Sequence, residues 1–282
     1  MEIGQQPMTQ SQETKISAST KLIIKLSSSA VSVVLSDQIG NIIKYIHNDF
    51  AEKIEPKNLP EKLDLIFNKF KIDNSELINI KLIVCNKLSS LVPKNLFDEK
   101  LSLEYLKFNS KLLENDFAAN DSIDEIEAVN VFLPYVNVNN YLIDRFGSFN
   151  YYHYSTVLIK KIIKYNSVKE ISVYANIQSD YFQILILKNK NLIYFNSFDV
   201  NNKEDILYFL LFCFEQNKID NIKTKLSLIG NIEFENNTYR LIEKFINNIE
   251  IIDFFQKEKT KVQNIKNYSE IDYLILWELY RG

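Results

Sequence analysis

The sequence predicts an α/β protein built from two copies of one unit, in which three strands, a helix and a fourth strand follow in order. Two observations predict this fold. Runs rich in β-branched residues and bounded by polar turns occur in groups of three. Each group precedes a segment whose apolar residues have the spacing of an amphipathic helix. The balance of 46% hydrophobic and 24% charged residues is typical of a folded globular protein.

The first unit is expected near the start of the chain. Its three strands are predicted at residues 21–26, 30–35 and 42–46. A helix follows Pro60, whose fixed φ suits the first helical turn. The continuous apolar run at residues 80–85 predicts the fourth, buried strand.

The second unit repeats this order. Strands are predicted at residues 169–176, 181–187 and 192–196. The helix that follows takes Asn202 as its N-cap, because an amide oxygen can accept a hydrogen bond from the first turn. The next strand is predicted at residues 225–229.

Short landmarks recur between the two units at nearly one spacing. The spacings are 148, 147 and 144 residues, measured from Phe50 to Phe198, from the Lys-Ile-Asp triplet at Lys71 to that at Lys218, and from Leu82 to Leu226. We interpret them as traces of an internal duplication.

The segment between the units is interpreted as an insertion at residues 89–150. It is expected to contain a helix at 98–108, an acidic loop at 114–127, a strand at 128–133 and a helix that ends at Phe146, before Gly147. The predicted organisation is therefore a polar, disordered tail at residues 1–20, a first subdomain at 21–150 that includes the insertion, and a second subdomain at 151–282.

Composition excludes several classes of protein. The net charge of −3 gives no general attraction to nucleic acid. The longest apolar run, residues 206–214, is too short to cross a bilayer, which takes about 20 residues. Cys85 and Cys213 each lie within an apolar run, which indicates buried free thiols and a reducing compartment. A cytoplasmic protein that is not an integral membrane protein is expected.

The order of the predicted elements is similar to that of the actin, hexokinase and Hsp70 superfamily. More closely, the chain resembles the bacterial family of unknown function DUF3822, over roughly residue 20 to the C-terminus. The motifs that carry this resemblance are Leu91 to Phe97, Ala128 to Pro134, Phe146-Gly147, and Asn196-Ser197-Phe198 followed by Glu204-Asp205. The resemblance implies an α/β, duplicated actin-like (ribonuclease H-like) ATPase fold, with two subdomains of mixed sheets flanked by helices.

The resemblance also implies where a nucleotide would bind. Enzymes of the superfamily hold ATP between the two halves, and the turn after the first strand of each half reads Asp-x-Gly. Glycine lets backbone N–H groups approach phosphate, and the acid holds hydrated Mg²⁺. Here these turns are residues 26–30, with hydroxyls but neither acid nor glycine, and residues 176–180, where Asn176 takes the place of the acid. Gly230 is one of the two glycines usual in the adenosine loop.

The sequence therefore predicts a vestigial cleft between the halves, near Ser28, Asn176, Gln178 and Gly230. We expect a non-catalytic scaffold or adaptor that acts through an unidentified protein partner, with no cofactor, no catalytic residue, no metal site and no nucleic-acid partner. The alternative is an ATP-binding or ATP-hydrolysing enzyme that uses Mg²⁺ with atypical phosphate loops. Nothing in the sequence identifies the partner, the process or the oligomeric state.

Other residue groups have structural interpretations. His47 and His153 are expected at the surface or in structural hydrogen bonds, since neither has an acidic and nucleophilic pair nearby in sequence. A solvated loop is expected for the acidic cluster, which consists of Asp116, Asp121, Asp124, Glu125 and Glu127. The aromatic stretch at residues 208–212 is expected in the core, and the helix predicted from Ser269 is expected to pack on its own domain rather than on a partner.

Overall fold

The structure is a computed structural model. It describes residues 20–73, 77–107, 112–113, 115–167, 170–178, 181–252, 275 and 278. The first 19 residues of the predicted tail therefore lie outside the described residues, and Thr20 already begins the first strand.

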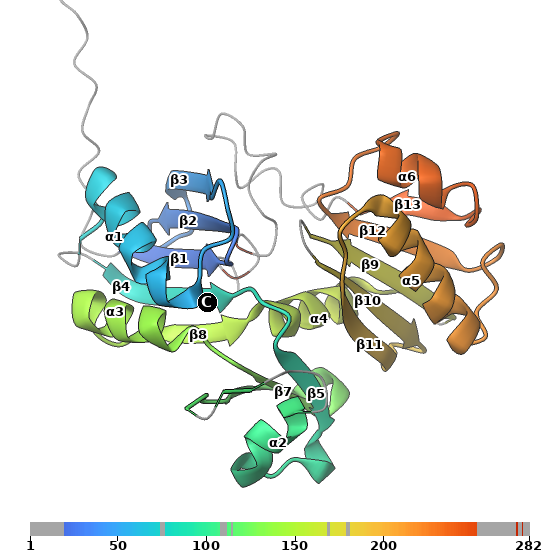
Figure 1. The fold of residues 1–282 in the computed structure, drawn as a ribbon, viewed down its shortest axis with the longest axis horizontal. Helices are drawn as coiled ribbons and strands as arrows, with labels where there is room; N and C mark the ends of the chain where they lie inside the picture. Colours follow the sequence, from blue (N-terminus) through green and yellow to red (C-terminus); the bar gives the residue numbers. More distant parts are fainter. Residues whose placement is uncertain are drawn as a thin grey trace, which may run out of the picture.

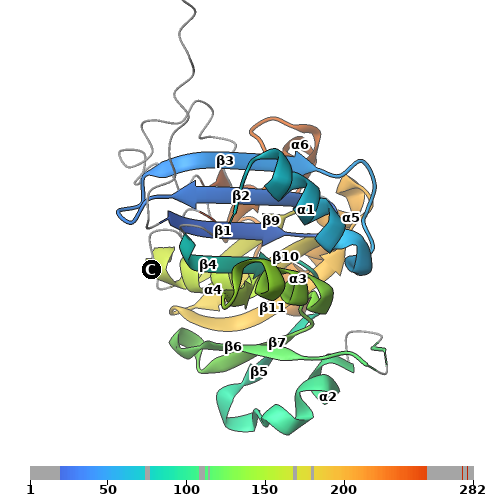
Figure 2. The same ribbon diagram turned by 90° about the vertical axis from the view of Figure 1, so that its left-hand side faces the viewer.

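The first half of the chain forms a five-stranded mixed sheet with the order β3-β2-β1-β4-β8. Its strands are β1 (Thr20–Leu26), β2 (Ala30–Ser36), β3 (Ile42–Asp49), β4 (Leu77–Val84) and β8 (Asn150–His153). The helices on its outer face are α1 (Leu59–Lys69) and α3 (Val136–Phe146), as Figures 1 and 2 show. The predicted strands and helix of this half are confirmed. The last strand of the sheet, β8, crosses the predicted boundary at residue 150 and pairs in parallel with β4.

The second half forms another five-stranded sheet with the corresponding order β11-β10-β9-β12-β13. Its strands are β9 (Ile171–Ile177), β10 (Tyr181–Lys188), β11 (Asn191–Asp199), β12 (Lys225–Gly230) and β13 (Ile249–Ile251). Helices α5 (Lys203–Gln216) and α6 (Asn237–Ile242) cover its outer face (Figure 1). The predicted N-cap of α5 is confirmed, since the Asn202 Oδ1 accepts a hydrogen bond from the Asp205 N–H at 2.9 Å.

Helix α4 (Tyr154–Tyr165) lies between the two large sheets (Figure 1). Its apolar residues join residues of both sheets in one buried cluster, which includes Ile23, Ile83, Leu185 and Ile229. The molecule is thus layered as helices, sheet, α4, sheet and helices. This arrangement confirms the predicted α/β class with mixed sheets flanked by helices.

A third, smaller sheet with the order β5-β7-β6 is inserted between β4 and β8. It consists of β5 (Ser89–Pro93), β6 (Ala119–Ile123) and β7 (Ala128–Phe132), with α2 (Ser102–Lys107) packed against it. The remaining short elements are 3-10 helices at Pro56–Asn58, Lys94–Leu96, Glu99–Leu101 and Asp124–Ile126. The prediction of an acidic loop at 114–127 is wrong in its second half, because β6 and a 3-10 helix occupy residues 119–126.

Strand register tests the repeated landmarks one by one. The turns after α1 and α5 correspond, since Lys71 and Lys218 have positive φ values of 53° and 54°. The N–H of the following residue, Ile72 or Ile219, bonds a carbonyl five residues back at 2.8 Å in both turns. The same local sequence therefore ends both helices in the same way, a left-handed residue followed by a buried isoleucine.

The two strand landmarks are shifted by two residues. Leu82 pairs with Ile24, whereas the residue at the same level of the second sheet is Leu228 rather than Leu226. The position equivalent to Phe198 is Asn48 rather than Phe50. A shift of two residues along a strand keeps a side chain on the same face, so the apolar pattern matches although the register does not.

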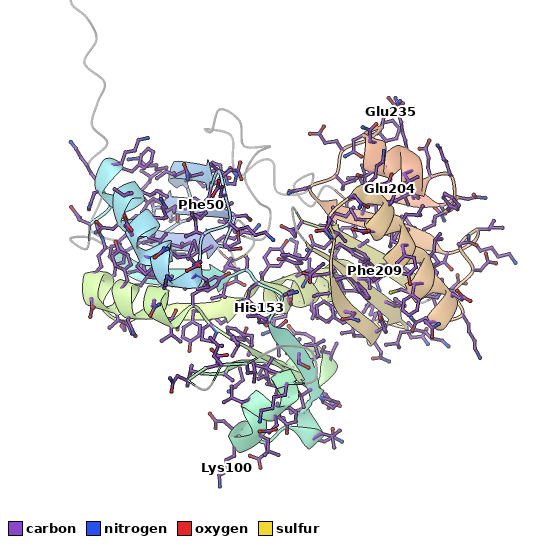
Figure 3. All side chains as sticks on the ribbon, viewed as in Figure 1. Phe50, Lys100, His153, Glu204, Phe209 and Glu235 are labelled. Carbon is purple, nitrogen blue, oxygen red and sulfur yellow. The ribbon has the colours of Figure 1, made fainter. Side chains whose placement is uncertain are left out.

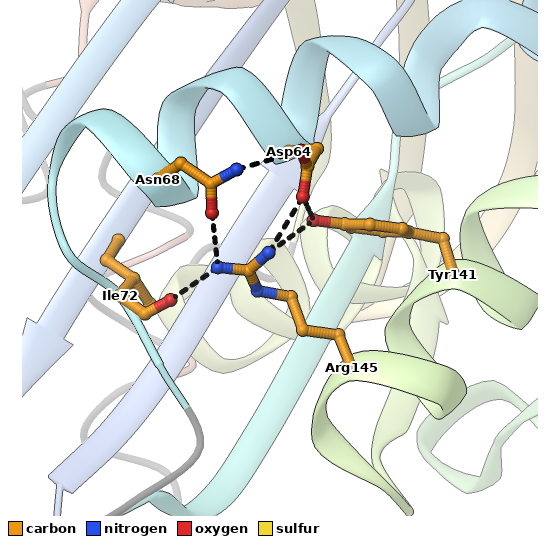
Figure 4. A network of polar contacts seen from close by, with 5 residues as sticks. All are labelled: Asp64, Asn68, Ile72, Tyr141 and Arg145. Atoms are coloured by element: carbon orange, nitrogen blue, oxygen red, sulfur yellow. Dashed lines mark hydrogen bonds and ion pairs between the residues drawn. The ribbon is translucent and has the colours of Figure 1, made fainter.

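Arg145 ties α3 to α1 through a polar network on the outer face (Figure 4). Its Nη1 donates to Asp64 Oδ1 at 2.8 Å and to the Tyr141 hydroxyl at 3.2 Å. Its Nη2 donates to Asn68 Oδ1 at 3.0 Å and to the carbonyl of Ile72 at 2.9 Å. Burial, reinforced by the hydrogen bond to Asp64, raises the pKa of Tyr141 to about 12. The guanidinium thus fixes both the helix pair and the turn that follows α1.

Helix α5 is only partly buried, which corrects the prediction for residues 208–212. Leu210 is fully buried, but Tyr208 is 62% exposed and Phe212 is 40% exposed. The two exposed rings stack on each other with centroids 6.3 Å apart. Cys85 and Cys213 are both buried thiols that form no disulfide, as predicted.

Two described residues near the end of the chain, Ile275 and Glu278, contact other parts of the fold. Ile275 is fully buried in the cluster between the sheets. Buried Lys81 of β4 donates to the carbonyl of Glu278 at 3.0 Å, and its Nζ lies 3.5 Å from the carboxylate of the same residue. The rest of the helix predicted from Ser269 lies outside the described residues.

Candidate functional site

The start of α4 is the point at which the three sheets meet, and Figure 3 shows His153 there, at the centre of the molecule. His153 ends β8 and is the N-cap of α4, and Tyr154, Ser155 and Thr156 form the first turn. All four side chains are at most 1% exposed. Buried polar groups require hydrogen-bond partners, and together these residues find them in three parts of the fold: the loop after β4, the third sheet and the second large sheet.

His153 links α4 to the loop after β4. Its Nδ1 accepts a hydrogen bond from the Ser155 N–H at 3.2 Å, which requires that nitrogen to carry no proton. Its Nε2 lies 3.0 Å from the carbonyl of Asn86 and donates to it. Burial lowers the pKa of His153 to about 3, so the ring is neutral. The predicted hydrogen-bonded structural role of His153 is confirmed.

Asp121 of β6 links α4 to the third sheet. Its Oδ2 accepts hydrogen bonds from the His153 N–H at 2.8 Å and from the Thr156 hydroxyl at 2.7 Å. Asp121 is only 8% exposed, so the prediction that it lies in a solvated loop is wrong. Burial raises the pKa of Asp121 to about 6, against the lowering effect of the two donors.

Ser155 and Tyr154 link α4 to the second sheet. The Ser155 hydroxyl accepts a hydrogen bond from Gln183 Nε2 at 2.7 Å, and Gln183 Oε1 accepts one from Asn176 at 3.1 Å. The Tyr154 hydroxyl donates to Asn176 Oδ1 at 3.3 Å and accepts from Gln178 Nε2 at 3.1 Å. Two of the residues predicted at the cleft therefore contact the start of α4.

The structure brings together three of the four residues predicted at the cleft. A Cβ added to Gly230 would lie 2.9 Å from Asn176 Oδ1 and 3.0 Å from Gln178 Nε2. Ser28 lies in the other hairpin, between β1 and β2, where its carbonyl accepts a hydrogen bond from the Ile54 N–H at 2.7 Å. In the part of the chain that the structure describes, no hydrogen bond connects Ser28 to the other three.

The register of the two hairpins shows what stands opposite Asn176. The Ser27 N–H bonds Ala30 O and the Gln178 N–H bonds Tyr181 O, so the hairpins correspond residue by residue. Lys25 is then the equivalent of Asn176. Its Nζ lies 4.9 Å from the centre of the Tyr154 ring. One buried tyrosine thus contacts the equivalent residue of each large sheet.

Sequence reasoning missed Tyr154, Ser155, Thr156, Gln183 and Asp121 as parts of this junction. One signal was available, because Gln183 is the only polar residue between apolar neighbours in the interior strand β10. Among the described residues, no group of three or more histidine, cysteine or acidic side chains is arranged to hold a metal ion. Over the same residues, no helix is long and apolar enough to cross a membrane.

Comparison with known families decides the affiliation. The sequence model of the protein family of unknown function DUF3822 matches residues 9–249. The chain belongs to this family. No curated protein matches the chain.

Solved structures similar to this DUF3822 protein show the fold. A Bacteroides thetaiotaomicron protein with an actin-like ATPase fold and unknown function is 19% identical, with a TM-score of 0.77 over 90% of this chain and 99% of the other. A chain of the PilM-PilN type IV pilus biogenesis complex is 10% identical, with a TM-score of 0.60 over 94% of this chain and 98% of the other. The DUF3822 protein has the actin-like ATPase fold, as the sequence predicted.

Asp121 and His153 are expected to give opposite pH dependences of stability. The pKa of Asp121 is raised on folding, so its contribution is most favourable below about pH 4 and is lost as the pH rises to about 6. The pKa of His153 is lowered on folding, so its contribution is present above about pH 6.5 and is lost on acidification. Each group changes the free energy of unfolding by about 1.4 kcal/mol per pH unit, and between pH ~4 and ~6 the two opposite changes largely cancel.

Asp121→Asn should reveal the pH dependence of stability that His153 causes, because the opposing contribution of Asp121 is removed. Relative to the natural protein, the variant should lose about 2–3 kcal/mol of unfolding free energy between pH ~6.5 and ~4. Urea unfolding at several pH values measures the difference, and carboxylates elsewhere cancel because both proteins contain them. Parallel pH profiles of the two proteins would contradict the assignment of a raised pKa to Asp121.

Proposed function

We propose that this DUF3822 protein is a non-catalytic scaffold or adaptor that acts through protein–protein contacts, with a vestigial cleft near Ser28, Asn176, Gln178 and Gly230. One observation carries the proposal. Tyr154 is 1% exposed. Its ring contacts Lys25 of β1, and its hydroxyl donates a hydrogen bond to Asn176 of β9. The side chain therefore occupies space between the two strand ends that enzymes of the superfamily use for phosphate and metal.

The chemistry of the two strand ends supports the same proposal. A carboxylate at this position would attract hydrated Mg²⁺, whereas the Lys25 ammonium repels it. Asn176 is neutral, and both ends of its amide are engaged by Tyr154, Gln178 and Gln183. The space that a Cβ of Gly230 would fill is taken by the Ile177 carbonyl, 2.2 Å away, so this glycine serves strand packing.

The fold of the PilM-PilN structure supports the proposal by analogy alone, since fold does not imply function. That structure is the PilM-PilN type IV pilus biogenesis complex. A cytoplasmic location, in a bacterium, belongs to the same proposal and is supported by the two buried cysteines that form no disulfide. The corresponding strand orders support an internal duplication. Subdomains at residues 21–150 and 151–282 belong to the same proposal, with β8 crossing this boundary to join the first sheet.

An ATPase assay tests the proposal against the alternative of an atypical enzyme. Phosphate release from Mg-ATP by the purified protein should not exceed that of buffer. Asn176→Ala serves as the matched variant, since Asn176 stands where enzymes of the superfamily have the aspartate of the Asp-x-Gly turn. Turnover by the natural protein that Asn176→Ala abolishes would overturn the proposal.

A further inference from the structure

A pocket of about 360 Å³ opens where the third sheet meets the first. Its walls come from β6, β8 and α4, and its lining includes Asn120, Asp121, Tyr151, Tyr152 and Lys160. The volume lies in the range of small-ligand sites in proteins. Its lining includes none of the four residues predicted at the cleft and no residue of the second large sheet, so it is distinct from the cleft between the two large sheets.

Asp121 is a buried carboxylate whose hydrogen bonding is half complete. Both of its hydrogen bonds, from the His153 N–H and the Thr156 hydroxyl, go to Oδ2. Oδ1 accepts no hydrogen bond from any described residue, and it is not fully enclosed by protein atoms. Since Asp121 is 8% exposed and lines the pocket, Oδ1 is the oxygen left open to it.

We infer that this pocket binds an organic cation, a guanidinium or primary ammonium group, which donates a hydrogen bond to Oδ1 of Asp121. A carboxylate with only neutral donors on one oxygen gains most from a charged donor on the other. The half-buried rings of Tyr151 and Tyr152 provide aromatic surface of the kind on which such cations pack.

None of the charged groups around Asp121 in the described residues donates a hydrogen bond to its Oδ1, so a ligand can take this place. Lys160 of α4 lines the pocket and attracts the carboxylate from a distance, but it forms no hydrogen bond or ion pair with any described residue. Glu278 repels the carboxylate, and its own charge is met by Lys81. His153 is neutral and gives only its backbone N–H.

Proton linkage follows from this geometry. Burial raises the pKa of Asp121 to about 6, so the site gains its negative charge as the pH rises through that value. A bound cation favours the ionised form and must lower the same pKa. Cation affinity should therefore increase between pH ~5 and ~7.

The inference does not rest on the proposed function. The same cation could come from a free metabolite or from an arginine or lysine of a partner protein. A small guanidinium compound and a peptide with one central arginine distinguish these sources, since only a partner segment gains further contacts. Stronger binding of the peptide points to a partner, and equal binding points to a small molecule.

The test is an NMR titration of the full chain labelled with ¹³C, which reports the side-chain carboxyl of Asp121. The probes are N-acetyl-arginine amide and its neutral isostere N-acetyl-citrulline amide, at concentrations up to tens of millimolar. The arginine probe should lower the titration midpoint of Asp121, whereas the citrulline probe should not. Equal effects of the two probes, or no effect of either, would overturn the inference.

Variants locate the binding site. Asp121→Asn should weaken binding of the arginine probe about tenfold or more, since a hydrogen bond to a charged group is lost. Lys160→Met should strengthen it, because a like charge leaves the pocket. Asp124→Asn is the matched control, since Asp124 is an exposed carboxylate already paired with Lys94 at 2.9 Å. Should Asp121→Asn fail to fold, the midpoint shift in the natural protein decides the question by itself.

Discussion

Gly230→Ala is expected to lower the free energy of unfolding by about 3 kcal/mol or more. Gly230 has a φ of +88°, a conformation that costs an alanine roughly 1–2 kcal/mol. The new Cβ would also lie 2.2 Å from the carbonyl oxygen of Ile177. That oxygen belongs to the central strand β9 and accepts a hydrogen bond from Asn231, so it cannot move without disturbing the β9–β12 pairing.

Gly147→Ala is the matched control for this effect. Gly147 has a similar φ of +81°, but nothing lies within 4 Å of an added Cβ. With a ψ of −145° it lies in a backbone region that is essentially limited to glycine, so it should lose only this backbone contribution, about 1–3 kcal/mol. Urea unfolding followed by circular dichroism gives both values. Equal destabilisation by the two substitutions would show that the close approach at Gly230 has no energetic consequence.

Tyr154→Ala is expected to cost about 3–5 kcal/mol, the usual loss when a fully buried aromatic residue is truncated. The ring is 1% exposed and belongs to the cluster between the two large sheets. Its removal leaves a cavity between Lys25 and Asn176 and removes one of the hydrogen-bond partners of Gln178. The second half should therefore lose part of its attachment to α4.

Tyr154→Phe separates packing from hydrogen bonding. The ring and its contact with Lys25 remain, whereas the hydrogen bonds to Asn176 and Gln178 are lost, so the cost should be about 1–2 kcal/mol. Chemical unfolding of both variants under one set of conditions measures the contribution of ring packing and that of the hydroxyl hydrogen bonds. If Tyr154→Ala were no more destabilising than Tyr154→Phe, the ring would not be a packing element of the junction.

Local sequence patterns were sufficient to predict most of the strands and helices of the two large sheets. The four predicted strands of each large sheet follow from β-branched or apolar runs between polar turns, and Asn202 marks the start of α5 because its capping preference is local. The insertion was less predictable. The alternating buried and exposed residues of β6 include Asp121, whose burial depends on donors from His153 and Thr156, more than 30 residues away in sequence.

The candidate site was predicted in part for the same reason. Asn176, Gln178 and Gly230 are near each other because β9 and β12 are adjacent, and strand order can be predicted from the repeated unit. Tyr154 was not predicted, since its role depends on α4 lying between the sheets, and no local pattern specifies that position. The equivalence of Lys25 and Asn176 required the register of both hairpins, which a two-residue shift in the landmarks obscured.

The most direct test of a filled cleft is thermal melting of the protein with and without Mg-ATP. A site with a Kd of about 10 μM would add about 2.7 kcal/mol at a hundredfold excess of nucleotide, which is a readily measured shift. Because Tyr154 occupies the space between Lys25 and Asn176, we expect the melting temperature to stay unchanged at millimolar Mg-ATP. A clear rise in melting temperature with Mg-ATP that Asn176→Ala abolishes would contradict this account.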